Sequence, residues 1–224
     1  MEAEKRSRAI QRLLDEISQN ASETANRTRR KKFSKTTMAA MAKVQRDRFM
    51  QPGYESSAYI NRPKPIGYGQ TISQPYIVAL MTDLLGLKGD ERVLEVGSGS
   101  GYQAAVLAEV LSDGHVYTVE LITQLARRAT DCINELGYSN VTLKQGDGYK
   151  GWPENSPFDA IIVTAAPERV PDALIEQLKP GGRLVVPVGK AHSHQDLVVV
   201  DKDREGRIRT EKLISVAFVP LVHS

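Results

Sequence analysis

Val93-Leu-Glu-Val-Gly-Ser-Gly-Ser-Gly101 is the stretch that decides the fold. Its apolar beginning predicts a buried β-strand over 92–96, and the residues that follow predict a helix over 101–111. Glycines between a strand and a helix let the main chain turn tightly and let a ligand approach the backbone closely. The stretch therefore predicts a ligand-binding loop in an α/β protein.

The glycine spacing separates two kinds of ligand. A dinucleotide-binding loop has the pattern G-x-G-x-x-G, which would place glycine at 102, where this chain has tyrosine. The pattern here is G-x-G-x-G, and it follows an acid, Glu95. An acid beside the loop suits a ligand with a cationic amine, or a hydrogen-bonded water network.

Strands and helices alternate along the rest of the chain from residue 74. This alternation, with continuous apolar strands, predicts a mostly parallel sheet with helices on both faces. A polar turn over 201–209, with no helix, joins the last two strands and predicts an antiparallel finish. The expected strands are 92–96, 115–120, 141–145, 160–164, 183–187, 197–200 and 213–219, and the expected helices are 74–85, 101–111, 122–136 and 170–178.

The first third of the chain has a different pattern. Apolar spacing predicts helices over 2–18 and 38–49. Between them, the polar and basic residues 19–37 predict a mobile linker or exposed turn. Residues 51–70 are rich in proline and glycine and predict an irregular, packed connection. We therefore expect an N-terminal helical extension and substrate-side connection over 1–73, and a ligand-binding domain over 74–224.

Composition excludes several classes of protein. The 224 residues are enough for one core-bearing domain with an extra segment. A single cysteine, Cys132, excludes an intramolecular disulfide framework and a cysteine-based zinc cluster, and it suits a reducing cytoplasm. The apolar runs are too short to cross a membrane, and the N-terminus resembles no signal peptide. We therefore expect a cytoplasmic protein with no membrane partner.

The charge is unevenly distributed. Residues 1–50 hold 13 Lys and Arg against 6 Asp and Glu, whereas residues 51–224 hold 17 against 21. A basic arm could contact nucleic acid or an acidic partner, but charge runs are more often solvated surface. We interpret the basic residues as a solvated helix and linker.

Two further acids follow the next two strands. Glu120 ends the strand over 115–120, where its carboxylate can accept both hydroxyls of a ribose. Asp147, in Gln145-Gly-Asp-Gly148, can accept the exocyclic amine of adenine. Both lie at the carboxyl edge of the predicted sheet, where open α/β folds bind ligands. Together with Glu95, they predict a pocket for an adenosine with a cationic amino-acid tail, which indicates S-adenosylmethionine rather than NAD.

A further segment, Pro65-Ile-Gly-Tyr-Gly-Gln-Thr-Ile-Ser-Gln-Pro75, resembles the signature of protein-L-isoaspartate O-methyltransferases. The resemblance covers about residues 38–222. Its glycine loop and Lys-Pro-Gly-Gly are shared with many class I methyltransferases, whereas Gly-Gln-Thr-Ile-Ser is specific to this family. The other matching segments are 92–105, 146–148, 158–165, 178–184 and 218–221.

The resemblance implies a fold and a reaction. The family has the class I S-adenosylmethionine-dependent, Rossmann-like fold, a seven-stranded sheet with an N-terminal extension. Its members methylate the free α-carboxylate of L-isoaspartyl residues in damaged proteins and peptides and release S-adenosyl-L-homocysteine. Loss of methanol then gives a succinimide, which can reopen to normal aspartate. Isoaspartyl-containing proteins and peptides are thus the expected partners.

Site residues are carried over from matching positions. Ser73 matches the active-site serine, and its place before a helical run also predicts a helix N-cap. Because a carboxylate is already ionised at pH 7, Ser73 needs only to orient it, without acting as a nucleophile. The expected donor-binding residues are Gln70, Thr71, Ile72, Glu95, Gly97, Ser98, Gly99, Ser100, Glu120, Asp147 and Gly148.

Some features depart from this pattern or leave alternatives open. Residues 1–37 do not follow the family's usual opening, and Val222 makes a C-terminal contact with the donor doubtful. His192 and His194 are interpreted as loop residues, so we expect no metal. A nucleic-acid methyltransferase and a donor-binding scaffold without catalysis are the rival functions, and we do not expect nucleic acid as a partner. A monomer or a small homo-oligomer is expected.

Overall fold

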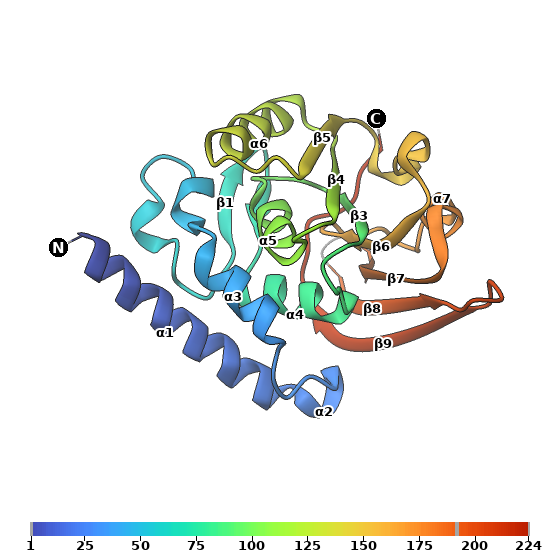
Figure 1. The fold of residues 1–224 in the computed structure, drawn as a ribbon, viewed down its shortest axis with the longest axis horizontal. Coiled ribbons are helices and arrows are strands. Elements are labelled where there is room, and N and C mark those ends of the chain that lie inside the picture. The colour runs from blue at the N-terminus through green and yellow to red at the C-terminus, as the bar shows by residue number, and fades with distance from the viewer. Residues whose placement is uncertain (1, 191–192, 224) are drawn as a thin grey trace.

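A seven-stranded sheet forms the centre of the computed structural model, which describes residues 2–190 and 193–223 (Figure 1). The strand order is β5-β4-β3-β6-β7-β8-β9. The strands are β3 (Arg92–Val96), β4 (His115–Glu120), β5 (Val141–Gln145), β6 (Phe158–Val163), β7 (Leu178–Gly189), β8 (Gln195–Lys202) and β9 (Ile208–Val216).

Strand directions confirm the expected sheet. β5, β4, β3, β6 and β7 are parallel neighbours, whereas β8 pairs antiparallel with both β7 and β9. The antiparallel finish is therefore present, and β8 is the strand that runs against the others. The chain builds outward from β3 to β5 and then crosses to β6, so a crevice opens at the carboxyl ends of β3 and β6.

Helices cover both faces of the sheet, as expected because successive side chains of β3 point to opposite faces. Val93 belongs to a core cluster with α4 (Pro75–Leu85), α5 (Tyr102–Val110) and α6 (Thr123–Glu135), whereas Leu94 belongs to a second cluster with α7 (Asp172–Gln177). The helix predicted over 170–178 is shorter than expected. The helix ends at Gln177, and the residues 178–182 that follow form the beginning of β7.

The prediction of a mobile linker or exposed turn over 19–37 is wrong except for residues 29–34, a mostly exposed turn between α2 and α3. α1 continues over Glu2–Glu23, α2 follows at Ala25–Thr28, and α3 begins at Lys35 and ends at Lys43. Ala21 is fully buried, and the hydroxyls of Thr24 and Tyr76 lie 2.6 Å apart. Polar side chains of this segment form hydrogen bonds with residues far away in the sequence, and the local sequence does not show those partners.

The irregular connection predicted over 51–70 is only partly confirmed. β1 (Lys64–Gly67) and β2 (Gln70–Ile72) form an antiparallel hairpin after the short 3-10 turns η1 (Arg46–Phe49) and η2 (Glu55–Ser57). Tyr68, at the hairpin tip, has φ +55° between two glycines that also have positive φ.

The helix predicted over 38–49 is found as α3 followed by η1.

The N-terminal segment shares its core with the sheet. Leu13 and Ile17 of α1 and Met41 of α3 belong to the same cluster as Val93 of β3. In Figure 1, α1 lies along the outer edge of the molecule, with α3 and α4 between it and the sheet. Residues 1–73 are therefore a segment packed on the α/β core and do not have a separate core in the described chain.

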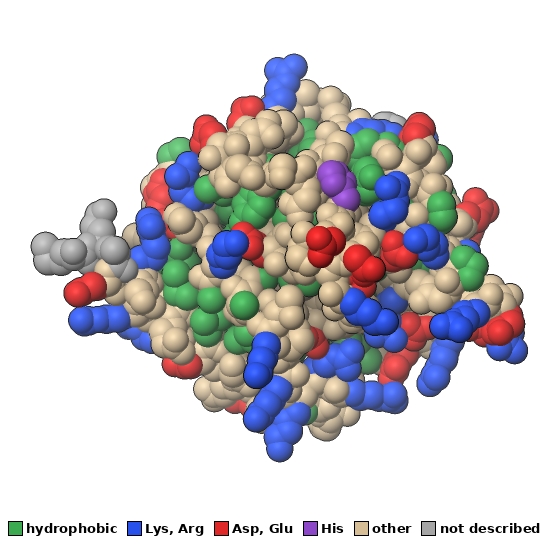
Figure 2. Space-filling view, in the orientation of Figure 1, with side chains coloured by type: hydrophobic (Ala, Val, Ile, Leu, Met, Phe, Trp, Pro, Cys, Tyr) green, Lys and Arg blue, Asp and Glu red, His purple; other side chains and the backbone are tan. Residues whose placement is uncertain are grey.

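The basic residues near the N-terminus lie mostly at the surface. Figure 2 shows Lys and Arg side chains along the lower edge of the molecule, where α2 lies in Figure 1. Arg29 pairs with Glu211 of β9 and Arg30 with Asp83 of α4. No helix among the described residues is long and apolar enough to cross a membrane.

Candidate active site

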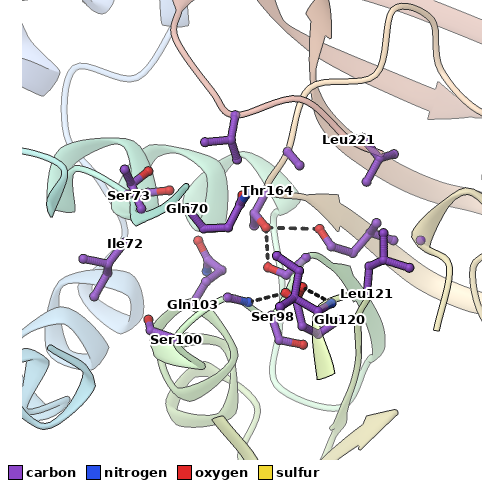
Figure 3. Close-up of a pocket in the computed structure, with 18 of the residues that line it drawn as sticks. Gln70, Ile72, Ser73, Ser98, Ser100, Gln103, Glu120, Leu121, Thr164 and Leu221 are labelled. Atoms are coloured by element: carbon purple, nitrogen blue, oxygen red, sulfur yellow. Dashed lines mark hydrogen bonds between the residues drawn. The ribbon is translucent and has the colours of Figure 1, made fainter. Parts of the chain in front are cut away.

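A cavity, here called the donor cavity, opens at the carboxyl edge of the sheet (Figure 3). It lies between the loops after β3, β4 and β6, the hairpin β1–β2, and the C-terminal segment 219–222. Its lining residues are Gln70, Thr71, Ile72, Ser73, Val78, Val96, Gly97, Ser98, Gly99, Ser100, Tyr102, Gln103, Val119, Glu120, Leu121, Ile122, Gly148, Thr164, Ala165, Val219, Pro220, Leu221 and Val222.

The glycine loop is held by its neighbours. Gly97 has φ +97°, and a Cβ atom there would lie 2.6 Å from the Thr164 hydroxyl. The same hydroxyl donates to the Gly97 and Val96 carbonyls, while the Gly97 N–H donates to the Val119 carbonyl at 2.8 Å. Only glycine fits this position, because both its backbone angle and its surroundings exclude a side chain.

Glu120 is the acid that lines the donor cavity. One of its carboxylate oxygens accepts the Gly99 N–H at 2.8 Å, and the other accepts the Ile122 N–H at 2.9 Å. The side chain is therefore fixed between the glycine loop and the end of β4. Each oxygen retains a further lone pair, so the carboxylate can also accept two hydroxyls of a ribose.

Glu95 lies behind the loop and not in the donor cavity. It is fully buried, and it accepts a hydrogen bond from Thr118, whose hydroxyl is 2.6 Å from that of Ser98. Burial raises the pKa of Glu95 to about 8; Thr118 lowers it and the nearby Glu120 raises it further. Glu95, largely protonated at neutral pH, is therefore absent from the residues that line the donor cavity and is linked to the loop through Thr118 and Ser98.

Asp147 and Gly148 follow β5, at the far end of the donor cavity. Gly148 lines the cavity, whereas the Asp147 carboxylate lies beside it and accepts the Tyr149 N–H at 2.9 Å. His223 stacks on Tyr149 with ring centroids 3.7 Å apart, and its Nδ1 lies 3.5 Å from Asp147 Oδ2. Asp147 is thus positioned near the cavity but is not among its lining residues.

Ser73 joins the hairpin to α4. It lines the donor cavity and also a second cavity of about 430 Å³, here called the groove. Figure 3 shows Ser73 and Gln70 on one side of the donor cavity and Glu120 with Ser98 on the other. The predicted N-cap role is wrong, because Gln74 occupies the N-cap position of α4. The groove is lined by Pro63, Thr71, Ser73, Gln74, Ile77, Thr164, Ser215, Val216, Ala217, Phe218 and Val219.

Several lining residues were missed in the sequence. Thr164 and Leu221 lie inside segments that resemble the family, but nothing local marks them as site residues. Val222 lines the donor cavity despite the doubt about a C-terminal contact. Other missed residues are Val78, Val96, Tyr102, Gln103, Val119, Leu121, Ile122, Ala165, Val219 and Pro220.

A metal site was not expected. Among the described residues, no group of three or more His, Cys, Asp or Glu could hold a metal ion. His194 lies 2.8 Å from Asp196, and His192 lies outside the described residues.

The fold and the donor cavity define a class I S-adenosylmethionine-dependent methyltransferase. The family model described as protein-L-isoaspartate(D-aspartate) O-methyltransferase matches residues 19–224. The chain therefore belongs to this family, whose enzymes methylate L-isoaspartyl residues with S-adenosylmethionine as the methyl donor.

Individual relatives agree with this assignment. The chain is 50% identical over 210 residues to protein-L-isoaspartate O-methyltransferase 2 of Syntrophobacter fumaroxidans, covering 94% of this chain and 84% of that protein. It is 56% identical over 184 residues to protein-L-isoaspartate O-methyltransferase of Opitutus terrae, covering 82% and 78%.

Solved structures show the same fold. A protein-L-isoaspartate O-methyltransferase superposes with a TM-score of 0.79 at 29% identity, covering 92% of this chain but only 65% of that longer chain. A putative member from Plasmodium falciparum, in complex with S-adenosyl-L-homocysteine, gives 0.76 at 25% identity, covering 92% of this chain and 97% of that one.

Proposed function

We propose that this chain methylates the free α-carboxylate of L-isoaspartyl residues and that Ser73 orients this carboxylate for the reaction. The observation that carries the proposal is the position of Ser73, where the donor cavity meets the groove. A peptide in the groove would bring its carboxylate to Ser73, and a donor in the other cavity would present its methyl group from the opposite side.

The reaction needs few catalytic groups. Bound S-adenosylmethionine supplies an electrophilic methyl group on a sulfonium. An isoaspartyl carboxylate is already an anion at neutral pH, so no side chain has to remove a proton from it. The Ser73 hydroxyl can donate a hydrogen bond to one carboxylate oxygen and aim the other at the methyl carbon. A new C–O bond forms as the C–S bond breaks, giving a methyl ester.

Donor binding uses residues from three consecutive strand ends. Glu120 would hold the ribose, and the glycine loop would bind the amino-acid tail. Ile122, Gly148 and the adjacent Asp147 would bind the adenine. This fit is supported by the two backbone N–H groups that fix the Glu120 carboxylate at the edge of the donor cavity.

The groove favours an isoaspartyl chain. Isomerisation moves the backbone through the side-chain carbon, so the carboxylate leaves the main chain as a short branch. Residues 215–218, at the end of β9 and just after it, line the groove together with Gln74 and Ile77 of the α4 region. An extended peptide between them would insert its branch toward Ser73, whereas an aspartyl peptide would present a carboxylate at the wrong distance.

The two parts of the chain have different roles in this proposal. Residues 1–73 provide the hairpin that covers the donor and the approach to Ser73, and residues 74–224 provide the donor-binding domain. We also propose a cytoplasmic enzyme that acts as a monomer or small homo-oligomer on isoaspartyl-containing proteins and peptides. The single cysteine, Cys132, is partly buried and suits a reducing compartment.

Methyl transfer to a matched pair of peptides tests the proposal. The peptides carry L-isoaspartate or L-aspartate at the same position, and S-adenosylmethionine carries a labelled methyl group. We expect base-labile label on the isoaspartyl peptide alone, because a methyl ester hydrolyses readily in base. Absence of label from both peptides, with the donor bound in calorimetry, would contradict the proposal, and label on added RNA or DNA would favour a nucleic-acid methyltransferase.

A further inference from the structure

A basic surface surrounds the turn between α2 and α3, and it is defined here by Arg27, Lys31, Lys32 and Lys35. All four side chains are exposed, and none of them forms an ion pair within the described part of the chain. Residues 24–46 contain eight Lys and Arg and no Asp or Glu. Figure 2 shows Lys and Arg side chains gathered along the lower edge of the molecule, where α2 lies in Figure 1.

The turn that carries the basic surface is fixed to the body of the protein. Arg29 pairs with Glu211 of β9 at 2.9 Å, and Arg30 pairs with Asp83 of α4 at 2.9 Å. The Ser34 N–H also donates to Asp83 at 2.7 Å. Both acids are therefore already paired with other arginines, and the basic surface is held in a defined place on the fold.

Glu23, at the end of α1, is the nearest acid in the sequence. Its carboxylate accepts hydrogen bonds from Gln19 at 2.8 Å and from Asn20 at 3.4 Å, both on the same helix. One carboxylate beside four exposed cations leaves an excess of positive charge. Because like charges repel and a complementary charge relieves the repulsion, this excess favours an anionic partner.

Both elements that anchor the turn continue into the groove. On β9, Glu211 precedes the groove residue Ser215 by four residues, which is about 13 Å along an extended strand. On α4, Asp83 follows the groove residue Ile77 by six residues, which is about 9 Å along a helix. An extended peptide spans such a distance with about four or five residues. A peptide in the groove can therefore reach the basic surface.

Phe33 helps to distinguish two kinds of anionic partner. It is the aromatic residue of the turn, and it is partly buried and stacked on Tyr76 of α4 with ring centroids 6.1 Å apart. Proteins that bind single-stranded nucleic acid combine cations with exposed aromatic faces on which bases stack. Because this ring is already used within the fold, the basic surface suits the carboxylates of a peptide better than the bases of a nucleic acid.

We propose that the basic surface binds an acidic segment of the protein substrate, about four to eight residues from the isoaspartyl residue in the groove. The enzyme thereby selects isoaspartyl sites that lie near acidic residues. The inference rests on the proposed function, because it places the isoaspartyl residue in the groove. The basic surface itself takes no part in methyl transfer and acts only on the affinity for the acceptor.

Methylation of matched isoaspartyl peptides tests the proposal. All share a short neutral sequence around the isoaspartate and carry a tail of about four glutamates or four glutamines, about four residues away on the N-terminal or the C-terminal side. We expect the glutamate tail on at least one side to lower KM about 5-fold relative to the glutamine tail, with kcat unchanged. The difference should vanish at about 0.5 M salt, where charges are screened.

A triple variant of the basic surface, Lys31→Gln with Lys32→Gln and Lys35→Gln, should lose the advantage of the glutamate tail. It should methylate the glutamine-tailed peptides as the wild type does, because none of the three lysines lines the donor cavity or the groove. All three side chains are exposed, so thermal melting should be unchanged and shows that the variant folds.

The matched control removes the same charge from another surface. Lys5, Arg8 and Arg12 are exposed on the N-terminal half of α1, which Figure 1 shows at the opposite end of that helix from α2. The triple variant with glutamine at these positions should keep the advantage of the glutamate tail. If it loses the advantage as fully as the lysine variant does, net charge and not the basic surface is responsible, and the proposal is overturned.

The remaining outcomes separate this proposal from the proposed function. Equal KM values for the two tails on both sides, or an advantage that survives in the lysine variant, overturn the proposal while methylation itself persists. If no peptide is methylated, the proposed function fails, and fluorescence anisotropy of a labelled glutamate-rich peptide without isoaspartate decides the surface: binding that only the lysine variant loses supports an acidic partner, and no binding overturns it. Tighter binding of a labelled single-stranded oligonucleotide overturns the choice of partner.

Discussion

The donor cavity has two walls of different origin. One wall, formed by the ends of β3, β4 and β5, comes from residues 96–148 and follows the order of the chain. The other wall combines residues 70–73, at the end of the hairpin, with the C-terminal residues 219–222. In the sequence, these are the first and the last of the residues that line the cavity. We expect the first wall to bind the methyl donor and fix its position. The second wall closes the cavity and places Ser73 beside it.

The difference between the walls is also one of support. Gly97 donates its N–H to Val119 of the neighbouring strand β4, and the Glu120 carboxylate accepts N–H groups of Gly99 and Ile122 in the loops after β3 and β4. The C-terminal segment is held by an isolated bridge to Ala166, outside the named strands of the sheet, in which the Val219 carbonyl accepts the Ala166 N–H and the Leu221 N–H donates to the Ala166 carbonyl. We therefore expect changes in the first wall to affect donor binding more strongly than changes in the C-terminal part of the second.

The largest effect is expected for Glu120→Ala in the first wall. The variant loses the acceptor for the Gly99 and Ile122 N–H groups and the proposed ribose contact, so kcat/KM for the donor should fall about 100-fold or more. Methyl-transfer kinetics at varied donor concentration measure it. Glu135→Ala, an exposed glutamate on α6, is the control, and a loss below about 10-fold would show that Glu120 does not hold the ribose.

Glu95→Gln tests the claim that Glu95, buried behind the first wall, keeps its proton at neutral pH. In the wild type, the pKa of Glu95 is raised to about 8, so the folded state keeps its proton while the unfolded state loses it from its ordinary value of 4.5 upward. Stability should therefore fall by roughly 3–5 kcal/mol as pH rises from 4.5 to 8. Glutamine has no proton to lose, so this part of the pH dependence should vanish.

Denaturant unfolding of both proteins at several pH values between 4.5 and 9 measures the difference. Parallel stability curves for wild type and Glu95→Gln would mean that Glu95 ionises normally in the folded protein.

Ser73→Ala probes the second wall where it meets the acceptor. Loss of the orienting hydroxyl should lower kcat about 10- to 100-fold, because alignment of the carboxylate with the methyl group is lost. The donor dissociation constant should change little, since Ser73 acts on the acceptor. Ser112→Ala, at an exposed turn, is the control. A variant that binds donor normally and methylates as fast as wild type would remove Ser73 from the mechanism.

The smallest effect is expected for Leu221→Ala in the C-terminal segment. Its backbone N–H still bonds to Ala166, so the variant removes only apolar packing, on the second core cluster and toward the donor cavity. We expect the donor dissociation constant to rise about 5-fold. Ile208→Ala is the matched control, because Ile208 is exposed at the start of β9, away from the cavity. An effect as large as that of Glu120→Ala would reverse the ranking of the two walls.

The two walls also differ in how far they could be predicted. The strand, turn and helix around Gly97 are encoded within ten residues, and the positions of Glu120 and Asp147 followed from the rule that parallel strands share a carboxyl edge. Nothing local could show that Glu95 faces away from the cavity, because its orientation depends on Thr118 of the neighbouring strand.

The N-terminal segment shows why the polar pattern over 19–37 was misleading. Besides local hydrogen bonds, the side chains of Thr24 and Asn20 bond to Tyr76 and Asn61, residues more than forty positions away. A polar residue with a distant partner has the same local sequence signature as a solvated one. The continuation of α1 to Glu23, which the apolar spacing did not predict, is therefore stabilised by contacts with distant segments of the chain.

The sequence by itself determined the alternating α/β order, the glycine loop, the family and the residue types at the donor site, since each depends on spacing within one strand–helix unit. Only the tertiary structure decided which residues enclose the donor cavity. It buried Glu95 behind the glycine loop and Arg46 against Tyr102. It also brought Thr164 and Leu221 to the donor cavity and placed Ser73 where two cavities meet. These contacts join distant parts of the chain, and the free energy of packing them together has no local signature.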